Sequence, residues 1–549
     1  MTTPRDPEVD ARTIAEIEAA ARANNLPRAV ELSHRALAGG LVHPLPLNLR
    51  SYWLVQQGRE REALVDLAHA VEIAPDDLLV RNAYGILLGK HQRWGEALAV
   101  LEESTRLAPE FPMARFSLGW ALESTGELND AQRQYERALA LDPNFVEPLV
   151  RLSSLAYRRA DWDAARALAD RALLLRPNDY VALTTLASVA VADGDLDRAE
   201  TIVRRLIATP APTPLDGASA RDVLADLRHA QGRYAQAFAA YTAANREKIK
   251  LYGQFFDMPG KTVTDYCHWL GDYFAQAEPA QWSAKQQSAP DDARDGAAGH
   301  VFLIGFPRSG TTLLENILAS HPGVATLEER DMLGEAAKTF LSNAAGRDSL
   351  ATLDAGSIAD WRARYWSRVR EHGAVVAGKV FVDKYPLTTL KLPVVAKLFP
   401  RARILFALRD PRDVVLSCYR RSFSMNTSMF EFLDLTRAAK FYDAAMTLAQ
   451  IYRAHLDLDW RELRHESLIA DFETEARGLC DFLGVPWNAE MADFATHAKS
   501  RTIRTPSSIQ VVKGLNREGM AQWKHYEAEM KPVMAVLEKW VEGFGYNAP

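Results

Sequence analysis

The hydrophobic and polar positions of the chain follow two different patterns, which divide it into two halves. Over residues 12–245, small and apolar positions recur at helical spacing and at a fixed longer period. From about residue 299 onward, short apolar runs alternate with helical patterns. The runs at 301–304 and 404–408 are typical of buried strands, and a helical pattern follows each. This order predicts an all-α first half and an α/β second half with a parallel sheet.

The longer period is 34 residues, and small residues and prolines carry it. Alanine recurs at this interval from Ala29 to Ala199, and proline from Pro75 to Pro177. Small residues let two helices cross closely, and proline marks the turn into the next repeat. This register is the tetratricopeptide signature and predicts a solenoid of about six repeats over residues 12–245. An insertion at 209–214 delays the last repeat by four residues.

The concave face of such a solenoid commonly binds extended peptides, so we expect a peptide or protein ligand there. The alternative is that the solenoid only caps or dimerises the second half. If it dimerises the second half, the protein is a homodimer. Residues 246–298 are expected to form a helical connector and a polar linker. The second domain is then expected to cover residues 299–549.

The loop Gly305–Thr312, with the sequence GFPRSGTT, carries the clearest chemistry. A glycine-rich turn from a strand into a helix directs backbone N–H groups and the helix dipole at one point, where they hold a phosphate. The nucleotide triphosphatase pattern would place a lysine at Thr311, and this loop has Arg308 instead. Hydroxyls with an internal arginine suit a phosphosulfate better than a metal-bridged triphosphate. We therefore expect no metal.

This loop and three later motifs, spread over residues 300–526, resemble the sulfotransferases that use 3′-phosphoadenosine 5′-phosphosulfate (PAPS). The likeness is to the tyrosylprotein sulfotransferase group, and it implies a P-loop-like sulfotransferase fold with PAPS as co-substrate. The resemblance implies three sets of donor-binding residues. The 5′-phosphosulfate would be held by Arg308, Ser309, Gly310, Thr311 and Thr312. The 3′-phosphate would be held by Arg409, Ser417 and Arg421, and the adenosine bisphosphate would be covered by Ser507 or Ser508, Lys513 and Asn516.

The resemblance also implies catalytic roles. Glu329 would accept the proton of the acceptor hydroxyl, and Glu328 is its alternative or its neighbour in the site. Arg308 would stabilise the sulfonate, Lys384 the leaving oxygen, and Ser507 would act beside them. Histidine is the competing base, and the candidates are His321, His465 and His525. The chain departs from the family pattern on both sides of Lys384, and it has Gln522 where the family has a lysine, with Lys524 as the alternative.

Composition narrows the function classes. The chain has 549 residues, a net charge of −6 and no basic stripe, which argues against nucleic-acid binding. Its three cysteines are too few and too far apart for a disulfide framework or a zinc site. The apolar runs are too short to span a membrane, so we expect a cytoplasmic protein.

The sequence therefore predicts transfer of a sulfuryl group from PAPS to an acceptor hydroxyl, with tyrosine in a peptide recruited by the repeats as the first candidate. A carbohydrate or lipid hydroxyl is the alternative acceptor. Two other classes stay open, a P-loop kinase and a non-catalytic repeat scaffold. Thr311 argues against the kinase, and the intact set of candidate catalytic residues argues against the scaffold.

Overall fold

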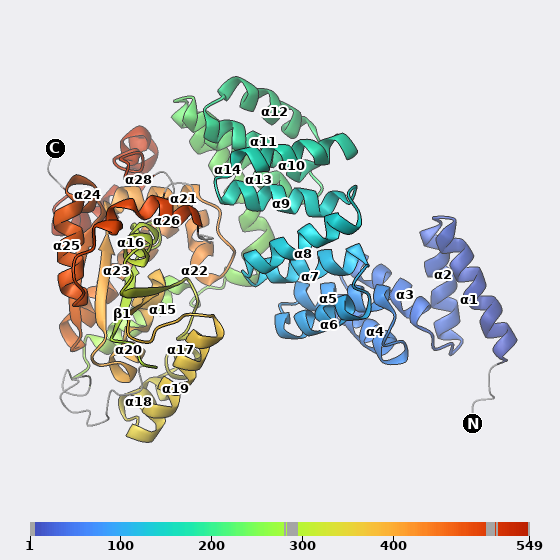
Figure 1. The fold of residues 1–549 in the computed structure, drawn as a ribbon, viewed down its shortest axis with the longest axis horizontal. Coiled ribbons are helices and arrows are strands. Elements are labelled where there is room, and N and C mark those ends of the chain that lie inside the picture. Colours follow the sequence, from blue (N-terminus) through green and yellow to red (C-terminus); the bar gives the residue numbers. More distant parts are fainter. Residues whose placement is uncertain (1–5, 279–281, 283–294, 501–510, 512–513, 547–549) are drawn as a thin grey trace. The chain divides into compact units, whose positions relative to one another are not determined.

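The computed structural model describes residues 6–278, 282, 295–500, 511 and 514–546. Residue contacts divide the chain into two units, one of residues 1–156 and 163–182 and one of residues 157–162 and 183–549. The first unit is entirely helical over its described residues. The second contains the last repeat helices and the α/β domain (Figure 1).

The repeats form antiparallel helix pairs, as predicted. The helices are α1 (Pro7–Arg22), α2 (Leu26–Ala38), α3 (Pro44–Gln56), α4 (Glu60–Ile73), α5 (Leu78–Lys90), α6 (Trp94–Leu107), α7 (Pro112–Ser124), α8 (Leu128–Leu141), α9 (Val146–Arg158), α10 (Trp162–Leu175), α11 (Tyr180–Asp193), α12 (Leu196–Ala208), α13 (Pro214–Ala230) and α14 (Tyr234–Phe256). The alanines that mark the period, from Ala29 to Ala199, are fully buried. A methyl group at Gly119 would lie 2.6 Å from the Tyr135 ring, so this helix crossing requires a glycine.

The α/β domain is built on one five-stranded parallel sheet, which confirms the predicted class. Its strands are β1 (Gly299–Gly305), β2 (Val324–Glu328), β3 (Val380–Lys384), β4 (Arg403–Leu408) and β5 (Asp459–Arg464), in the spatial order β2-β3-β1-β4-β5. The helices are α15 (Val263–Phe274), α16 (Thr311–Ala319), α17 (Gly334–Phe340), α18 (Ala344–Ala351), α19 (Ala355–Glu371), α20 (Leu392–Leu398), α21 (Pro411–Arg420), α22 (Thr427–Phe430), α23 (Leu435–His455), α24 (His465–Ala470), α25 (Phe472–Leu483), α26 (Phe494–Ser500) and α28 (Glu527–Gly543). Short 3₁₀ turns lie at Pro386–Lys391, Glu431–Leu433, Ala489–Asp493 and Gln522–Tyr526.

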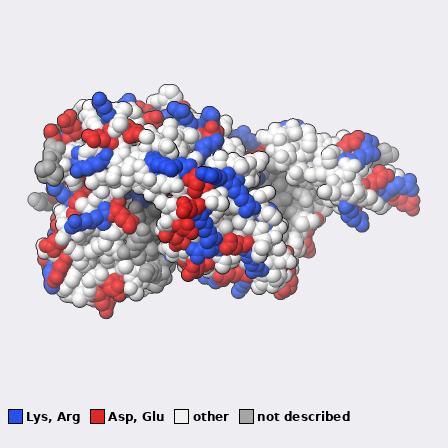
Figure 2. Space-filling view, turned by 90° about the horizontal axis from the view of Figure 1, so that it is seen from above, with Lys and Arg blue, Asp and Glu red and all other residues white. Residues whose placement is uncertain are grey.

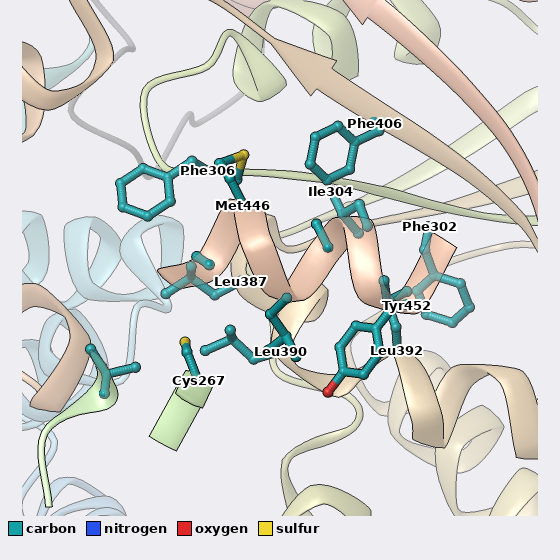
Figure 3. Packing of buried hydrophobic residues seen from close by; sticks show 14 of the residues in the cluster. Cys267, Phe302, Ile304, Phe306, Leu387, Leu390, Leu392, Phe406, Met446 and Tyr452 are labelled. Carbon is teal, nitrogen blue, oxygen red and sulfur yellow. The ribbon is translucent and has the colours of Figure 1, made fainter. Parts of the chain in front are cut away.

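Both faces of the sheet are buried. Successive residues of β1 point to opposite sides, and each set packs into its own apolar cluster. Val301 and Leu303 pack into one apolar cluster with α16 and α25. Phe302 and Ile304 pack into a second cluster with α23, and Figure 3 shows them together with Met446 and Tyr452 of that helix. The sheet is therefore the middle layer of three, and its strand ends form the edge where a site can lie.

The last repeat helices are part of the second unit by contacts. The hydroxyl of Thr242 on α14 lies 2.6 Å from the hydroxyl of Tyr419 on α21, and Asn245 donates to the Tyr419 carbonyl at 3.0 Å. Lys248 forms an ion pair with Asp222 at 2.7 Å and donates to Ser422 at 2.7 Å. These contacts place the last repeat helices in the second unit, whose continuous part begins at residue 183. The sequence pattern predicts a limit of the repeat region at residue 245.

Charges of both signs are interspersed on the face that Figure 2 shows, with no extended basic stripe there. This agrees with a net charge of −6 over the whole sequence. Within the described ranges, no helix combines the length and the apolar character needed to cross a membrane.

A short polar chain is buried beside the sheet. The hydroxyl of Tyr365 donates to Asp383 Oδ2 at 2.8 Å, and His300 Nε2 lies 2.9 Å from the same hydroxyl. Burial raises the pKa of Asp383 from 3.8 to about 7. The folded protein therefore keeps a proton on Asp383 that the unfolded chain loses.

We expect Gly305→Ala to destabilise the α/β domain by about 2 kcal/mol or more, because a methyl group there would lie 2.7 Å from the Ala407 carbonyl oxygen. Gly305 also has a φ of 153°, which L residues rarely adopt. Gly299→Ala on the same strand is the control, since its methyl group would make only ordinary contact with Val380 at 3.5 Å. Urea denaturation measures both variants. Equal stabilities would contradict this account of the strand end.

The proton on Asp383 predicts a pH dependence of stability. Because its folded pKa is raised, the contribution of this group to stability is lost as pH rises from about 4 to about 7, and it is constant above that range. Asp383→Asn should remove a slope of up to about 1.4 kcal/mol per pH unit. Urea denaturation at several pH values, with the exposed Asp360→Asn as control, measures the difference. An unchanged slope in Asp383→Asn would show that this carboxyl is ionised when buried.

Candidate active site

The candidate residues gather at the carboxyl edge of the sheet. The loop 306–310 follows β1, Glu329 follows β2, Lys384 ends β3 and Arg409 follows β4. In the strand register Glu328 lies beside Lys384, and Lys384 beside Leu303. Neighbouring parallel strands end on the same side, so four segments that are far apart in the sequence meet here.

The loop after β1 is shaped to receive an anion. Gly310 precedes the first turn of α16 with a φ of 95°, and a side chain there would lie 2.9 Å from Nδ1 of His465. Arg308 adopts a φ of 72°, a conformation that a non-glycine residue keeps only where its surroundings enforce it. Ser309, Thr311 and Thr312 are buried at the start of α16, where the backbone N–H groups of a helix can hold a phosphate.

Three arginines converge on this loop. Arg308 Nε donates to Ser417 Oγ at 3.0 Å, and Arg409 Nη1 donates to the carbonyl of Arg308 at 3.0 Å. Burial, and then the charges of Arg421 and Arg409, lower the pKa of the Arg308 guanidinium to about 9. Among the described atoms, Arg409 Nε is buried without a hydrogen-bond partner. A bound anion would relieve the repulsion and supply an acceptor for that donor.

Lys384 is surrounded by carboxylates. Its side chain is fully buried, and Nζ lies 2.9 Å from Glu329, 3.5 Å from Glu328 and 3.7 Å from Glu315. Burial alone would lower the pKa of Lys384, but the charges of these three groups raise it overall. Glu329 also has a φ of 43°, and its backbone N–H donates to the Lys384 carbonyl at 2.8 Å. The lysine and a constrained backbone together orient Glu329.

Arg308 and Glu329 face the same space, a cavity of about 740 Å³ that we call the reaction cavity. The start of α16 and the segment around Tyr385 also line it. Lys384 does not belong to its lining, because its ammonium group points to the carboxylates. The expected contact of Lys384 with a leaving oxygen thus stays a prediction, and the contact present in the structure is with Glu329.

Two neighbouring hollows receive the other candidate residues. The arginine cavity, of about 530 Å³, is lined by Arg409, Ser417 and Arg421. The loop pocket, of about 50 Å³, lies between Arg308, His465 and Asn516. The site residues predicted at Ser507, Ser508 and Lys513 lie outside the described residues.

The segment 514–526 is fixed to the helix after β4. Asp413 on α21 accepts hydrogen bonds from the backbone N–H groups of Ala521 at 2.6 Å and Trp523 at 2.9 Å. The guanidinium of Arg412 lies 4.0 Å from the centre of the Trp523 ring. These contacts hold Asn516 and Gln522 at the two hollows, whereas Lys524 is exposed and belongs to neither lining.

The three candidate histidines differ in position. His465 is at the loop pocket, where burial, and then Arg409 and Arg308, lower its pKa to about 3. His321 bonds to the Pro486 carbonyl through Nε2 at 2.8 Å and accepts from the Gly323 N–H through Nδ1 at 3.0 Å. His525 is exposed and stacks on Tyr234 with the ring centres 4.3 Å apart. The reaction cavity is lined by Glu329 and by none of these described histidines.

Sequence reasoning missed Glu315 and Asp226. Glu315 on α16 is almost fully buried, and it accepts from the Thr326 hydroxyl at 2.9 Å as well as facing Lys384. A single glutamate within the apolar run Leu313–Leu318 was the available signal. Asp226 on α13 lies 3.6 Å from Arg421 and accepts from the Tyr241 hydroxyl at 2.5 Å. No local pattern links a repeat helix to an arginine almost 200 residues later.

Comparison with known proteins agrees with this geometry. Residues 300–489 match a family model described as the sulfotransferase family, and residues 83–144, 150–214 and 184–249 match a tetratricopeptide repeat model. Protein-tyrosine sulfotransferase 1 of Danio rerio is 25% identical over 262 residues, which cover 45% of this chain and 72% of that protein. An uncharacterized protein of Aquifex aeolicus is 25% identical over 263 residues, covering 44% of this chain and 32% of that protein.

This chain therefore spans about a third of the length of the Aquifex relative. Among solved structures, the sulfotransferase domain of the Synechococcus PCC 7002 olefin synthase is 19% identical, with a TM-score of 0.34, and the match covers 48% of this chain and 100% of that one. The matched residues contain the phosphate loop, Glu329, Lys384 and Arg409. Residues 300–489 thus match the sulfotransferase family model, and segments that match the tetratricopeptide repeat model precede them.

Proposed function

We propose that the protein transfers a sulfuryl group from PAPS to the hydroxyl of a tyrosine in a peptide. The observation that carries the proposal is the group of converging arginines, of which Arg308 opens into the same cavity as Glu329. An anion-binding loop without a loop lysine suits the phosphosulfate of PAPS. The likeness to a protein-tyrosine sulfotransferase supports tyrosine as the acceptor.

Sulfuryl transfer requires positioning and charge stabilisation more than covalent help from the protein. In the proposed step the acceptor oxygen bonds to sulfur while the bond from sulfur to the bridging oxygen breaks. The electron pair of that bond leaves with adenosine 3′,5′-bisphosphate, and the acceptor proton passes to a carboxylate oxygen of Glu329. Arg308 and the N–H groups at the start of α16 stabilise the charge on the sulfonate oxygens.

The chain offers a donor site in three parts. Arg308, Gly310 and Thr312 at the loop would hold the phosphosulfate, and Arg409, Ser417 and Arg421 would hold the 3′-phosphate. Asn516 borders the loop pocket, where it would contact the nucleoside side of the donor. These roles agree in chemistry with the groups present, because guanidinium and hydroxyl groups are the usual partners of phosphate.

Arg409→Ala should weaken binding of adenosine 3′,5′-bisphosphate about 10- to 100-fold, since a hydrogen bond to a charged group contributes roughly 1.5–3 kcal/mol. Titration calorimetry measures the affinity. Arg453→Ala is the control, because this arginine is exposed and pairs only with Glu462 among the described groups. Unchanged affinity in Arg409→Ala would remove this arginine from the donor site.

Glu329→Gln should lower the transfer rate from labelled PAPS about 10²- to 10⁴-fold and leave the bisphosphate affinity within about twofold, because the amide cannot take the proton. Glu328→Gln is the matched comparison, since both glutamates contact Lys384. A larger loss in Glu328→Gln would reverse the two roles. Full activity in both would place the base elsewhere.

A further inference from the structure

The reaction cavity has two walls of different origin. One wall comes from the sulfotransferase-family domain and includes Arg308, Glu329 and Tyr385. The other comes from repeat residues that belong to the second unit. Its residues are Tyr157 and Arg158 of α9, Thr184 and Ser188 of α11, and Ser219, Asp222, Val223 and Asp226 of α13.

The repeat wall is one face of successive repeats. The pairs Thr184 and Asp222, and Ser188 and Asp226, are each 38 residues apart, which is one period of 34 plus the four inserted residues. These residues therefore occupy equivalent positions on α11 and α13, the first helices of their repeats. Stacked repeats present equivalent positions as a continuous stripe, the type of surface on which solenoids bind extended chains.

The wall is fixed to the catalytic segments by charge. Asp222 bonds to Lys248 and to the Ser422 hydroxyl, each at 2.7 Å, and Asp226 pairs with Arg421 at 3.6 Å. The segment after α21 is thereby held against α13, and it supplies Phe423, Ser424 and Asn426 to the same cavity. Repeat residues therefore form part of the lining of the reaction cavity.

The lining chemistry narrows the acceptor class. Hydroxyl groups of Thr184, Ser188 and Ser219 and the paired carboxylates dominate the repeat wall. Such groups can bond to peptide N–H and C=O groups, because a hydroxyl oxygen can still accept a hydrogen bond where its proton is already donated, as Ser219 donates to the Leu215 carbonyl at 3.0 Å. A cavity of about 740 Å³ is also much larger than a lone phenol requires.

We propose that the repeat wall is the acceptor-selecting half of the active site: it binds the main chain of an extended peptide while the tyrosine of that peptide reaches Glu329. The inference rests on the proposed function and deepens it. Thr184 and Ser219 are specificity-determining residues in this account, and they take no part in the transfer step. The repeats then select the substrate at the reaction centre itself.

The test compares two acceptors in the full-length protein with ³⁵S-labelled PAPS. One is a library of 15-residue peptides with a central tyrosine and varied flanks, and the other is 4-methylphenol, the tyrosine side chain without its backbone. Thr184→Trp and Ser219→Trp should lower peptide transfer at least tenfold and leave transfer to 4-methylphenol within about twofold, because both residues line the reaction cavity and neither lines the arginine cavity. Leu215→Trp is the matched control, because Leu215 is exposed on α13 and lies outside the cavity lining.

Bisphosphate affinity and thermal unfolding establish that the tryptophan variants are folded. Unchanged peptide transfer in both folded variants, or an equal loss for both acceptors, would overturn the inference and leave the proposed function standing. Labelling of an oligosaccharide panel without labelling of peptides by the unaltered protein would also overturn it. If the unaltered protein labels no acceptor at all, the proposed function fails, and the inference fails with it.

Discussion

Compensation of buried charge at the carboxyl edge of the sheet is the constraint on which the rest of the site depends. Lys384 and Arg308 are both buried there, and both would be costly alone. Lys384 is compensated by Glu315, Glu328 and Glu329. Arg308 instead lies near two further arginines, which lower its pKa together with burial. Lys384 has its counter-ions within the protein, whereas a bound anion would supply the counter-charge for the arginines.

The order of the strands makes both arrangements available at once. Because β3 lies between β2 and β1, the lysine at its end reaches Glu328 and Glu329 on one side, and the phosphate loop begins on the other. Because β4 lies on the far side of β1, Arg409 reaches the carbonyl of Arg308. Glu329, the proposed proton acceptor, and the loop 306–310, the proposed anion site, thus follow strands that are separated by one strand. This separation suits a reaction in which a hydroxyl meets a bound anionic group.

Much of this could be predicted from the sequence because it is local. The loop Gly305–Thr312 is a short motif, and alternating strand and helix patterns imply parallel strand ends that meet. The 34-residue period likewise defines the repeats. The partner of Lys384 could not be predicted, because the direction of a side chain at a strand end depends on neighbouring strands. The contact of Asp226 with Arg421 could not be predicted either, since it joins a repeat helix to a segment almost 200 residues later in the same unit.

The same tertiary packing explains why the last repeats group with the α/β domain. A solenoid needs a cap where its final helix would otherwise expose apolar surface. Here Ala237 and Tyr241 of α14 belong to the apolar cluster that also contains Phe302 of β1, so the α/β domain itself is the cap. The same contacts therefore serve two purposes. They cap the repeat array, and they hold in place the repeat residues that line the reaction cavity together with Glu329. If the repeat wall selects the acceptor as proposed, a change in the repeats can alter substrate choice without changing the residues of the transfer step.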